Sequence, residues 1–461
     1  MRYVISGTML LLCASAFGQY GYGPGSYSIE RWDEDYSYLK DPAYRTDFFD
    51  SIKYIPISAD GDSYLSLGGQ ARWRMDYFNN TEFGAGTQDE NGFQLFRLLA
   101  HADAHFGPNF RVFLQLDASL EYDRSGGPRP GDVNDFDVQQ AFFDVNFPLQ
   151  RSDSLLFRVG RQELIYGAQR LVSPNDWGNV RRRFDGVKAA LSLPNDTAEI
   201  FLVRPVLVEK SHLDSVDDHT AFAGIYNVTA FPDVWRDAHA KLDTYLFFLD
   251  QTPSQTTGVT YSADTFTLGV RPHATPGPWD LDLEADWQFG RYEDSAICAY
   301  SIAADAGYTF ATLAFMPRLA LGLDIASGSP NAAHRFNQLF PPQYLFLGHM
   351  YLFGRENIID LHPELTFNLP HDLTLDIAQH FFWRQNTHDA VYNLNGGVVR
   401  ASDGSDARTI GSEFDISLYW QIQRHVSAYI GYAHFFTGSF IQQTGPHSDE
   451  DFAYVSFTFT F

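Results

Sequence analysis

The chain has 461 residues, of which 44% are hydrophobic, 16% aromatic and 19% charged. This aromatic content excludes a disordered chain, and the formal net charge of −25 argues against a nucleic-acid binder. The 36 glycines and only 5 methionines favour strands and turns over long helices. The length fits either several soluble domains or one large all-β domain.

The N-terminus has the features of a secretory signal peptide. Arg2 supplies a positive charge, residues 4–13 are apolar, and small residues follow up to Gly18. We therefore expect removal of residues 1–18, which takes the mature protein out of the cytoplasm. Removal also leaves Cys298 as the lone cysteine, so no internal disulfide can stabilise the mature chain.

Alternation of apolar and polar residues runs along the rest of the chain. In residues 279–289, large apolar side chains alternate with the carboxylates of Asp280, Asp282, Glu284 and Asp286. A strand places these two sets on opposite faces, whereas a helix would mix them. Patterns of this kind predict strands at 64–78, 94–106, 110–121, 135–147, 154–163, 184–194, 197–206, 220–230, 239–250, 259–271, 279–292, 298–311, 316–326, 356–369, 372–384, 408–422, 425–437 and 451–461.

The connections between these strands alternate between short and long. Short turn signals occur at residues 107–109, 194–196, 369–372 and 423–424. Long polar stretches occur at 79–93, 122–134, 164–183, 327–355, 385–407 and 438–450. No segment offers the ~18 apolar residues of a membrane helix. The pattern is typical of an all-β, transmembrane antiparallel β-barrel of about 18 strands, with short periplasmic turns and long extracellular loops.

Two further features favour the bacterial outer membrane over a soluble β-sandwich. Aromatic residues cluster near expected strand ends, for example at Tyr77 and Phe78, where they suit the lipid headgroups. The chain also ends on Phe461 after an alternating strand, like bacterial outer-membrane proteins. We expect residues 19–60 to form a periplasmic, plug-like segment and residues 61–461 to form the barrel, in contact with outer-membrane lipid.

Several blocks of the sequence resemble the bacterial alginate-export outer-membrane proteins. The strongest block is residues 158–172, followed by residues 179–187. Flanking similarities lie at residues 48–50 with 53–56, 126–130, 360–363 and 431–436, so the resemblance covers nearly all of the mature chain. It implies a monomeric eighteen-stranded barrel whose basic lumen passes an anionic polysaccharide outward. Export of this kind could also involve a periplasmic scaffold as a partner.

Basic residues on the polar faces of the strands are the candidate pore lining. Guanidinium groups suit a passing polyuronate, because each can hold a carboxylate through paired hydrogen bonds and then release it. Four of the candidates lie on the polar face of expected strands and five crowd the strand ends and the loop between residues 161 and 184. The candidates are Arg72, Arg74, Arg158, Arg161, Arg170, Arg181, Arg182, Arg183 and Lys188.

Two observations keep other interpretations open. The arginines could instead pair with Asp76, Asp176 or Asp185 and stiffen the wall. The carboxylates at 280–286 would point inward and repel a polyanion unless they face arginines or lie behind a folded loop. The solute could therefore be an alginate-like acidic polysaccharide, its fragments or small anions.

Signals of an enzyme are weak. His101, Asp103 and His105 share one strand face and could form a metal or proton-relay cluster, although wall lining is the simpler interpretation. We found no phosphate-binding loop, dinucleotide fingerprint or paired-cysteine site. We therefore expect no catalytic residues, no bound metal and no cofactor. The alternatives to an anion porin are an outer-membrane barrel enzyme acting on lipid or glycan, a general diffusion porin and an adhesin.

Overall fold

The computed structural model describes residues 27–88, 92–129, 131–150, 153–232, 234 and 238–461. The expected signal peptide, residues 1–18, and the first part of the expected N-terminal segment, residues 19–26, lie outside the described residues. Within the described part, the search for helices long and apolar enough to cross a membrane found none.

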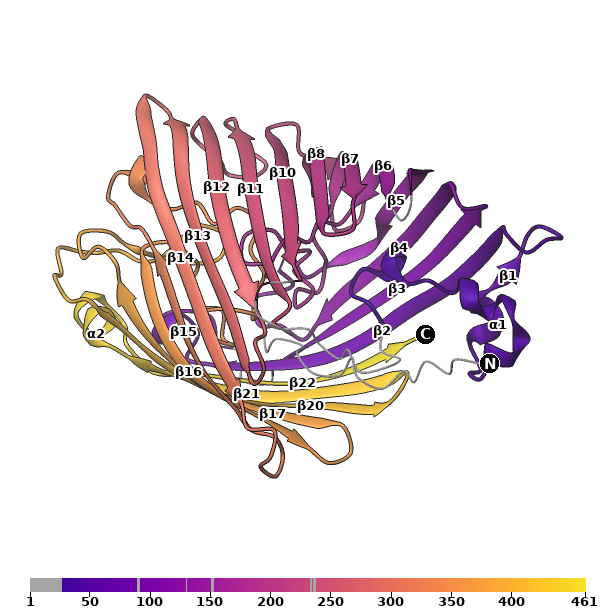
Figure 1. Cartoon of the computed structure of the whole chain (residues 1–461). Coiled ribbons are helices and arrows are strands. Elements are labelled where there is room, and N and C mark those ends of the chain that lie inside the picture. Colours follow the sequence, from indigo (N-terminus) through magenta and orange to yellow (C-terminus); the bar gives the residue numbers. More distant parts are fainter. Residues whose placement is uncertain (1–26, 89–91, 130, 151–152, 233, 235–237) are drawn as a thin grey trace.

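In the described part of the chain, eighteen antiparallel strands form one closed barrel (Figure 1). β2 pairs with β3 on one side and with β22 on the other, so the first and last strands close the sheet. Closure satisfies the backbone of both edge strands, as lipid requires. The strands are β2 Tyr64–Asn79, β3 Phe93–Phe106, β4 Phe110–Tyr122, β5 Asn134–Pro148, β6 Ser154–Gln162, β7 Phe184–Ser192, β8 Asp196–Leu207, β10 Thr220–Phe231, β11 Ala240–Gln251, β12 Ala263–Ala274, β13 Trp279–Tyr292, β14 Ser295–Thr309, β15 Arg318–Ala326, β16 Ile358–Leu369, β17 Leu373–Arg384, β20 Thr409–Gln423, β21 Val426–Thr437 and β22 Glu450–Thr460.

The predicted fold class is confirmed, with small differences at the strand ends. β12 was expected from residue 259 but begins at Ala263, because Ser254 and Val259 form a bridge inside the preceding connection. β13 and β14 are joined by only Glu293 and Asp294, at the barrel end where the other connections are long. We call that end the loop end, and the opposite end, with its short connections, the turn end.

Burial along the strands follows the predicted alternation. In β13, Trp287 is 50% exposed on the outer face, whereas Glu284 is 5% exposed on the inner face. Outward apolar side chains give the barrel the lipid-facing surface that a membrane strand needs. The polar side chains therefore gather inside, where they must find partners.

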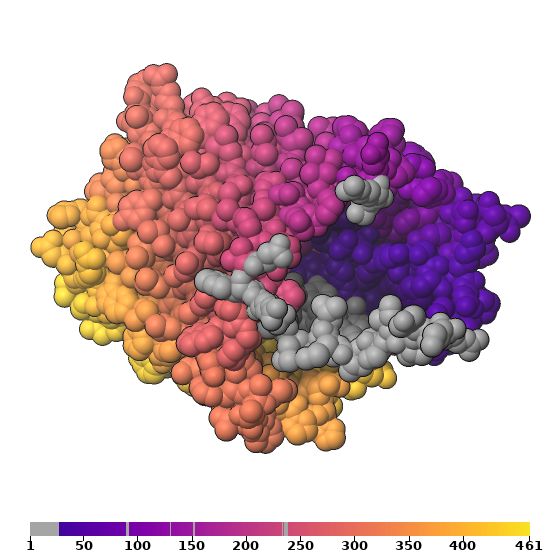
Figure 2. All heavy atoms as spheres, in the orientation of Figure 1, coloured from indigo at the N-terminus to yellow at the C-terminus, as the bar shows by residue number. Residues whose placement is uncertain are grey.

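Short elements lie at both ends of the barrel. At the turn end are β1 Ile55–Pro56 and α1 Asp50–Lys53, beside the start of β2 (Figure 1). The molecule is hollowed beside its indigo wall (Figure 2). The remaining short elements are η1 Arg31–Asp33, η2 Ser37–Lys40, η3 Pro42–Tyr44, η4 Thr81–Gly84, β9 Ser215–Val216, η5 Ala332–His334, β18 Val391–Tyr392, β19 Val398–Arg400 and α2 Ser439–Thr444.

Candidate functional site

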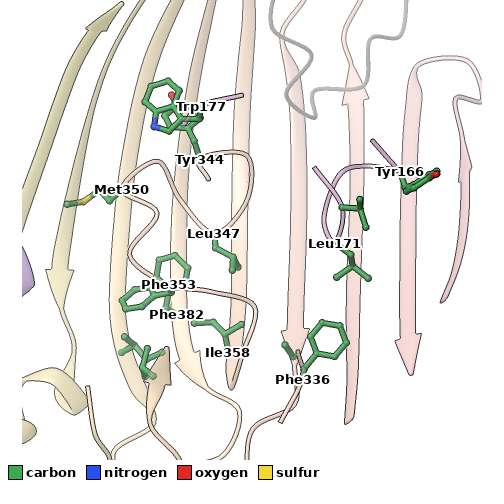
Figure 3. Packing of buried hydrophobic residues seen from close by; sticks show 14 of the residues in the cluster. Tyr166, Leu171, Trp177, Phe336, Tyr344, Leu347, Met350, Phe353, Ile358 and Phe382 are labelled. Atoms are coloured by element: carbon green, nitrogen blue, oxygen red, sulfur yellow. The ribbon is translucent and has the colours of Figure 1, made fainter. Parts of the chain in front are cut away.

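Two long loops fold into the barrel and join each other there. The loop of residues 163–183 follows β6, and the loop of residues 327–357 follows β15. Val172 and Phe340 form a parallel bridge between them, and Trp177 stacks on Tyr344 with ring centroids 3.9 Å apart. Figure 3 shows Trp177 and Tyr344 together, with side chains of both loops lying against the strands. We call these two segments the inner loops.

Apolar packing fixes the second inner loop to the wall. Phe353 lies edge to face against Phe382 of β17, with centroids 5.2 Å apart, and both side chains are fully buried (Figure 3). Met350 and Leu347 belong to the same buried cluster. A barrel of this width is not filled by its own wall residues, so the loops supply the missing core.

Arginines of β2 and β3 hold the tip of the first inner loop. The Nη1 atom of Arg72 donates to the carbonyl oxygen of Asp176 at 2.7 Å, and that of Arg74 donates to the carbonyl oxygen of Trp177 at 2.5 Å. Arg97 donates to the carbonyl oxygens of Asp176 and Gly178 at 2.9 and 3.1 Å. These guanidinium groups thus bind loop carbonyls and position the loop.

The carboxylate of Asp176 supplies a negative charge beside Arg72, Arg97 and Arg181. Its carboxylate accepts from Arg97 at 2.7 Å and lies 3.4 Å from Arg181. Burial alone would raise the pKa of Asp176, but the charges of Arg97, Arg181 and Arg72 hold it well below its usual range. Asp176 therefore remains an anion among cations. Arg74 pairs separately with Asp76, at 2.9 Å.

The same inner loop also crosses to the opposite, acidic wall. Arg170 donates to Asp282 at 3.0 Å, to Glu284 at 2.7 Å and to Asp305 at 2.6 Å. The carboxylates of β13 therefore face an arginine of a folded loop, which is one of the two arrangements the sequence left open.

Two arginines of the wall add to this neutralisation. Arg271 of β12 bonds to Asp282, and its Nη1 atom lies 2.8 Å from Asp243. Arg318 of β15 pairs with Asp280 at 2.6 Å. Three of the four inward carboxylates of β13 are thus ion-paired, and the fourth, Asp286, accepts a 2.6 Å hydrogen bond from Tyr245.

Arg158 and Lys188 contact the N-terminal segment. Arg158 forms a two-point ion pair with Asp144 at 2.8 and 2.9 Å. Its guanidinium also lies 3.8 Å from the centroid of Trp32. Lys188 lies 3.2 Å from Glu199 and faces the same indole at 5.5 Å. The part of the N-terminal segment that contains Trp32 thus lies against the inner wall.

The three consecutive arginines at the end of the first inner loop have different partners. Arg181 donates to Glu163 at 2.5 Å, and Arg183 bonds to Asp214. Arg182 donates to the carbonyl oxygens of Ser173 and Phe340 at 2.9 and 2.7 Å, which links the two inner loops. Burial lowers the pKa of Arg182 to about 10.

Arg161 does not line the pore, and that prediction is corrected here. It lies on the same face of β6 as the exposed Phe157 and Val159, opposite to the buried Arg158. It pairs with Asp185, the neighbouring residue on β7, at 2.8 Å, and lies 3.6 Å from Asp137. The reason is parity, because residues 158 and 161 are an odd number of positions apart.

The expected cluster of His101, Asp103 and His105 is not a converging site. Asp103 pairs with His105 at 3.1 Å and accepts a 2.7 Å hydrogen bond from Arg111. His101 instead stacks on Phe113, with centroids 5.5 Å apart. These side chains serve as wall lining.

A cavity of about 130 Å³ lies between the N-terminal segment, the first inner loop and the strands on either side of the barrel closure. Asp176 is the one carboxylate among its described lining residues. Its lining also includes Arg31, Arg72, Arg97, Arg181, Arg424 and His425. We call this the basic cavity.

Several residues of the basic cavity escaped the sequence analysis. Arg97 shares a strand face with His101 and Asp103, so the alternation could have identified it. Arg31, Arg424 and His425 lie outside the strands, and no periodic signal marks them. Arg31 reaches the cavity because it donates to the carbonyl oxygen of Gly69 at 3.1 Å.

Comparison with known proteins agrees with this architecture. The Acinetobacter baumannii protein OccAB3 superposes with a TM-score of 0.58 at 13% identity, covering 86% of this chain and 99% of that chain. Pseudomonas aeruginosa OpdK, solved with vanillate, gives 0.56 at 11% identity and coverages of 86% and 98%. Pseudomonas aeruginosa OpdQ gives 0.56 at 10% identity and coverages of 89% and 99%. At these identities the similarity shows the fold alone.

The search of curated proteins found no match. The family model described as alginate export matches residues 63–455, most of the chain and all but the last few residues of the barrel. The resemblance seen in the sequence is thereby confirmed. The chain is an outer-membrane β-barrel porin and belongs to the alginate export family.

Proposed function

We propose that this porin passes an anionic solute of the polyuronate class, an alginate-like acidic polysaccharide or its fragments, by way of the basic cavity. The observation that carries the proposal is the charge of the cavity lining. Five arginines and one histidine face it, against the single carboxylate of Asp176 among the described lining residues. An anion entering this cavity meets a net positive surface.

The net charge of −25 does not oppose this proposal. Charges outside the narrow part of a pore are screened within about 8 Å at physiological salt, whereas charges beside the solute are not. Among the inward carboxylates of β13, Asp280, Asp282 and Glu284 are paired with Arg318, Arg271 and Arg170, and Asp286 accepts a hydrogen bond from Tyr245. The basic cavity is therefore a positively charged site inside a chain of negative net charge.

The arginines divide into two groups by their partners. Arg72 and Arg97 donate to loop carbonyls, so they offer a solute only part of their hydrogen-bonding capacity. Arg424 lies in the turn between β20 and β21, 4.0 Å from Asp47, and the Arg424 side chain is 35% exposed. Such a partly solvated cation can attract a carboxylate and release it, as transit requires.

Two comparisons support the class of solute. The family of this chain is named for alginate export, and alginate is a polyuronate. The OpdK structure was solved with vanillate, an aromatic carboxylate. Both names point to carboxylate-bearing solutes for those proteins. The positively charged basic cavity of this chain suits solutes of that kind.

Conductance of the purified protein in planar bilayers tests the proposal. We expect preference for chloride over potassium, and block of the current by oligouronates but not by neutral oligosaccharides of equal length. Arg424→Glu should lower both the anion preference and the block. Arg204→Glu is the matched control, because Arg204 is an exposed arginine on the outer face of β8.

Cation preference of the unaltered channel would overturn the proposal. Block by vanillate without block by oligouronates would exclude a polymeric solute and indicate a pore for small carboxylates. Equal loss of anion preference in both variants would show that position 424 has no special role.

A further inference from the structure

A cluster of imidazole and carboxylate groups lies on the inner wall at β16 and β17, away from the lining of the basic cavity. Asp360 and His362 are on β16 and His380 is on β17, and all three are buried. One donor atom from each lies within 4.8 Å of the other two. The two rings stack with centroids 4.6 Å apart.

Both imidazole rings turn the same atom toward the carboxylate. The Nδ1 atoms of His362 and His380 lie 2.9 and 2.8 Å from Oδ2 of Asp360. The second carboxylate oxygen, Oδ1, is buried and has no hydrogen-bond partner among the described residues. A fully buried carboxylate with one unsatisfied oxygen in this position has capacity for another ligand.

The far side of each ring faces a second carboxylate. Nε2 of His362 lies 3.6 Å from Oδ1 of Asp305, and Nε2 of His380 lies 3.6 Å from Oδ2 of Asp415. In protein metal sites, an outer carboxylate commonly accepts from the ring nitrogen that does not bind the metal, and so fixes the tautomer. Both histidines have such a group available.

The surrounding charges leave Asp360 without an arginine or lysine partner in the described part of the chain. Asp324, directly opposite on β15, pairs with Arg355, and Asp305 pairs with Arg170. Asp360 makes ion pairs with the two histidines alone among the described residues. A cation bound between these three side chains would supply the missing positive charge.

We propose that Asp360, His362 and His380 form a binding site for a divalent transition-metal ion of the zinc class. Two nitrogen ligands and one oxygen favour such an ion over calcium or magnesium, which prefer oxygen ligands. With metal–ligand bonds of about 2.1 Å, tetrahedral ligands stand roughly 3.3 Å apart. The two Nδ1–Oδ2 distances, 2.9 and 2.8 Å, need to grow by only about half an ångström.

The position of the site indicates what the ion would stabilise. Met350 of the second inner loop donates its backbone N–H to Glu413 at 2.8 Å, and that of His349 donates to Asp415 at 3.3 Å. Asp415 also faces His380. The ion would thus join β16 to β17 directly beside the anchorage of this loop, and the site does not depend on which solute the pore carries.

Titration of the metal-stripped, detergent-solubilised protein with Co²⁺ tests the proposal. We expect about one equivalent to bind, with the intense visible absorption of tetrahedral cobalt, and Zn²⁺ to displace it. His362→Gln and His380→Gln should abolish the signal. His273→Gln should retain it, because His273 faces a single carboxylate, Asp243, at 3.2 Å on the same inner surface.

A signal that survives in both cluster variants, or the absence of saturable tetrahedral binding in the unaltered protein, would overturn the proposal. The latter result would mean that protonated histidines alone neutralise Asp360. Unheated gel mobility should confirm that each variant forms the barrel. If neither variant assembles, the spectrum of the unaltered protein decides by itself, because cobalt held by surface groups and water is octahedral and absorbs weakly.

Discussion

The two sides of the lumen carry opposite charges, and one loop binds both. On the basic side, Arg72 and Arg97 hold the tip of the first inner loop by its backbone carbonyl groups. On the acidic side, Glu284 and Asp305 hold Arg170 of the same loop. The loop therefore meets the basic wall with its carbonyl oxygens and the carboxylate of Asp176, and the acidic wall with the guanidinium of Arg170.

This difference has an energetic consequence. On the basic side, two arginines share the same carbonyl acceptors, so the loss of one leaves the other in place. On the acidic side, Arg170 serves three buried carboxylates, of which only Asp282 has a second arginine, Arg271, among the described ion pairs. Removal of one partner from a buried ion pair leaves an uncompensated charge, which costs far more than the loss of one hydrogen bond. The acidic side should therefore be the more sensitive of the two.

The largest effect should come from Arg170→Gln. It leaves Glu284 without an ion-pair partner among the described residues, Asp282 with Arg271 alone and Asp305 with His362 at 3.6 Å. We expect a loss of about 3–5 kcal/mol in the free energy that holds the loop and wall together. The measurements are the temperature at which the folded band disappears on a gel and the single-channel conductance, which should rise as the loop detaches. An unchanged melting temperature and conductance would contradict this account.

A smaller effect is expected from Arg72→Met on the basic side. Its hydrogen bonds to the carbonyl groups of residues 176–178 are lost, but Arg97 retains two of the same acceptors. We expect a cost of about 1–3 kcal/mol, measured by the same two assays. If Arg72→Met proves as damaging as Arg170→Gln, the proposed asymmetry between the two sides is wrong.

The smallest of these structural effects should come from Tyr344→Phe, where the two inner loops meet the wall. The Tyr344 hydroxyl bonds to those of Tyr429, at 2.6 Å, and Tyr454. Its ring, stacked on Trp177, stays in place in the variant. We expect a loss of about 1 kcal/mol and little change in conductance. A large rise in conductance would show that hydroxyl bonding, rather than stacking, holds the loops.

Docking of the N-terminal segment at the turn end should depend on pH. Burial, and then the charge of Arg31, lower the pKa of Lys53 in α1 to about 7 from 10.5. A lowered pKa means that the undocked segment binds more protons, so docking of residues 27–60 should strengthen as pH rises from about 7 towards 10 and be weakest below pH 7. Protease sensitivity of this segment measures the effect.

Lys53→Met should remove most of that pH dependence. Lys40→Met is the matched control, because Lys40 lies in the same segment but is paired with Asp62 at the surface, with its side chain 52% exposed. Equal pH dependence in the unaltered protein and in Lys53→Met would assign the effect to another group.

Sequence periodicity determined the wall of this protein. Inward and outward residues alternate because a strand has a period of two, so the alternation by itself places Arg72, Arg74, Arg158 and Lys188 on the inner face. The same rule corrects Arg161, whose odd spacing from Arg158 places it outside. The strand ends were less certain, because turns and bridges such as Ser254 with Val259 depend on local geometry.

Only the tertiary structure decided what the inward residues meet. The loops of residues 163–183 and 327–357 have no periodic pattern, and their fold depends on contacts with strands distant along the chain, 112 positions away in the pairing of Arg170 with Asp282. The cluster of Asp360, His362 and His380 arises only when β16 and β17 pair. Local sequence fixes which face of a strand a side chain occupies, whereas closure of the barrel and entry of the loops choose its partner, because those contacts are distant along the chain.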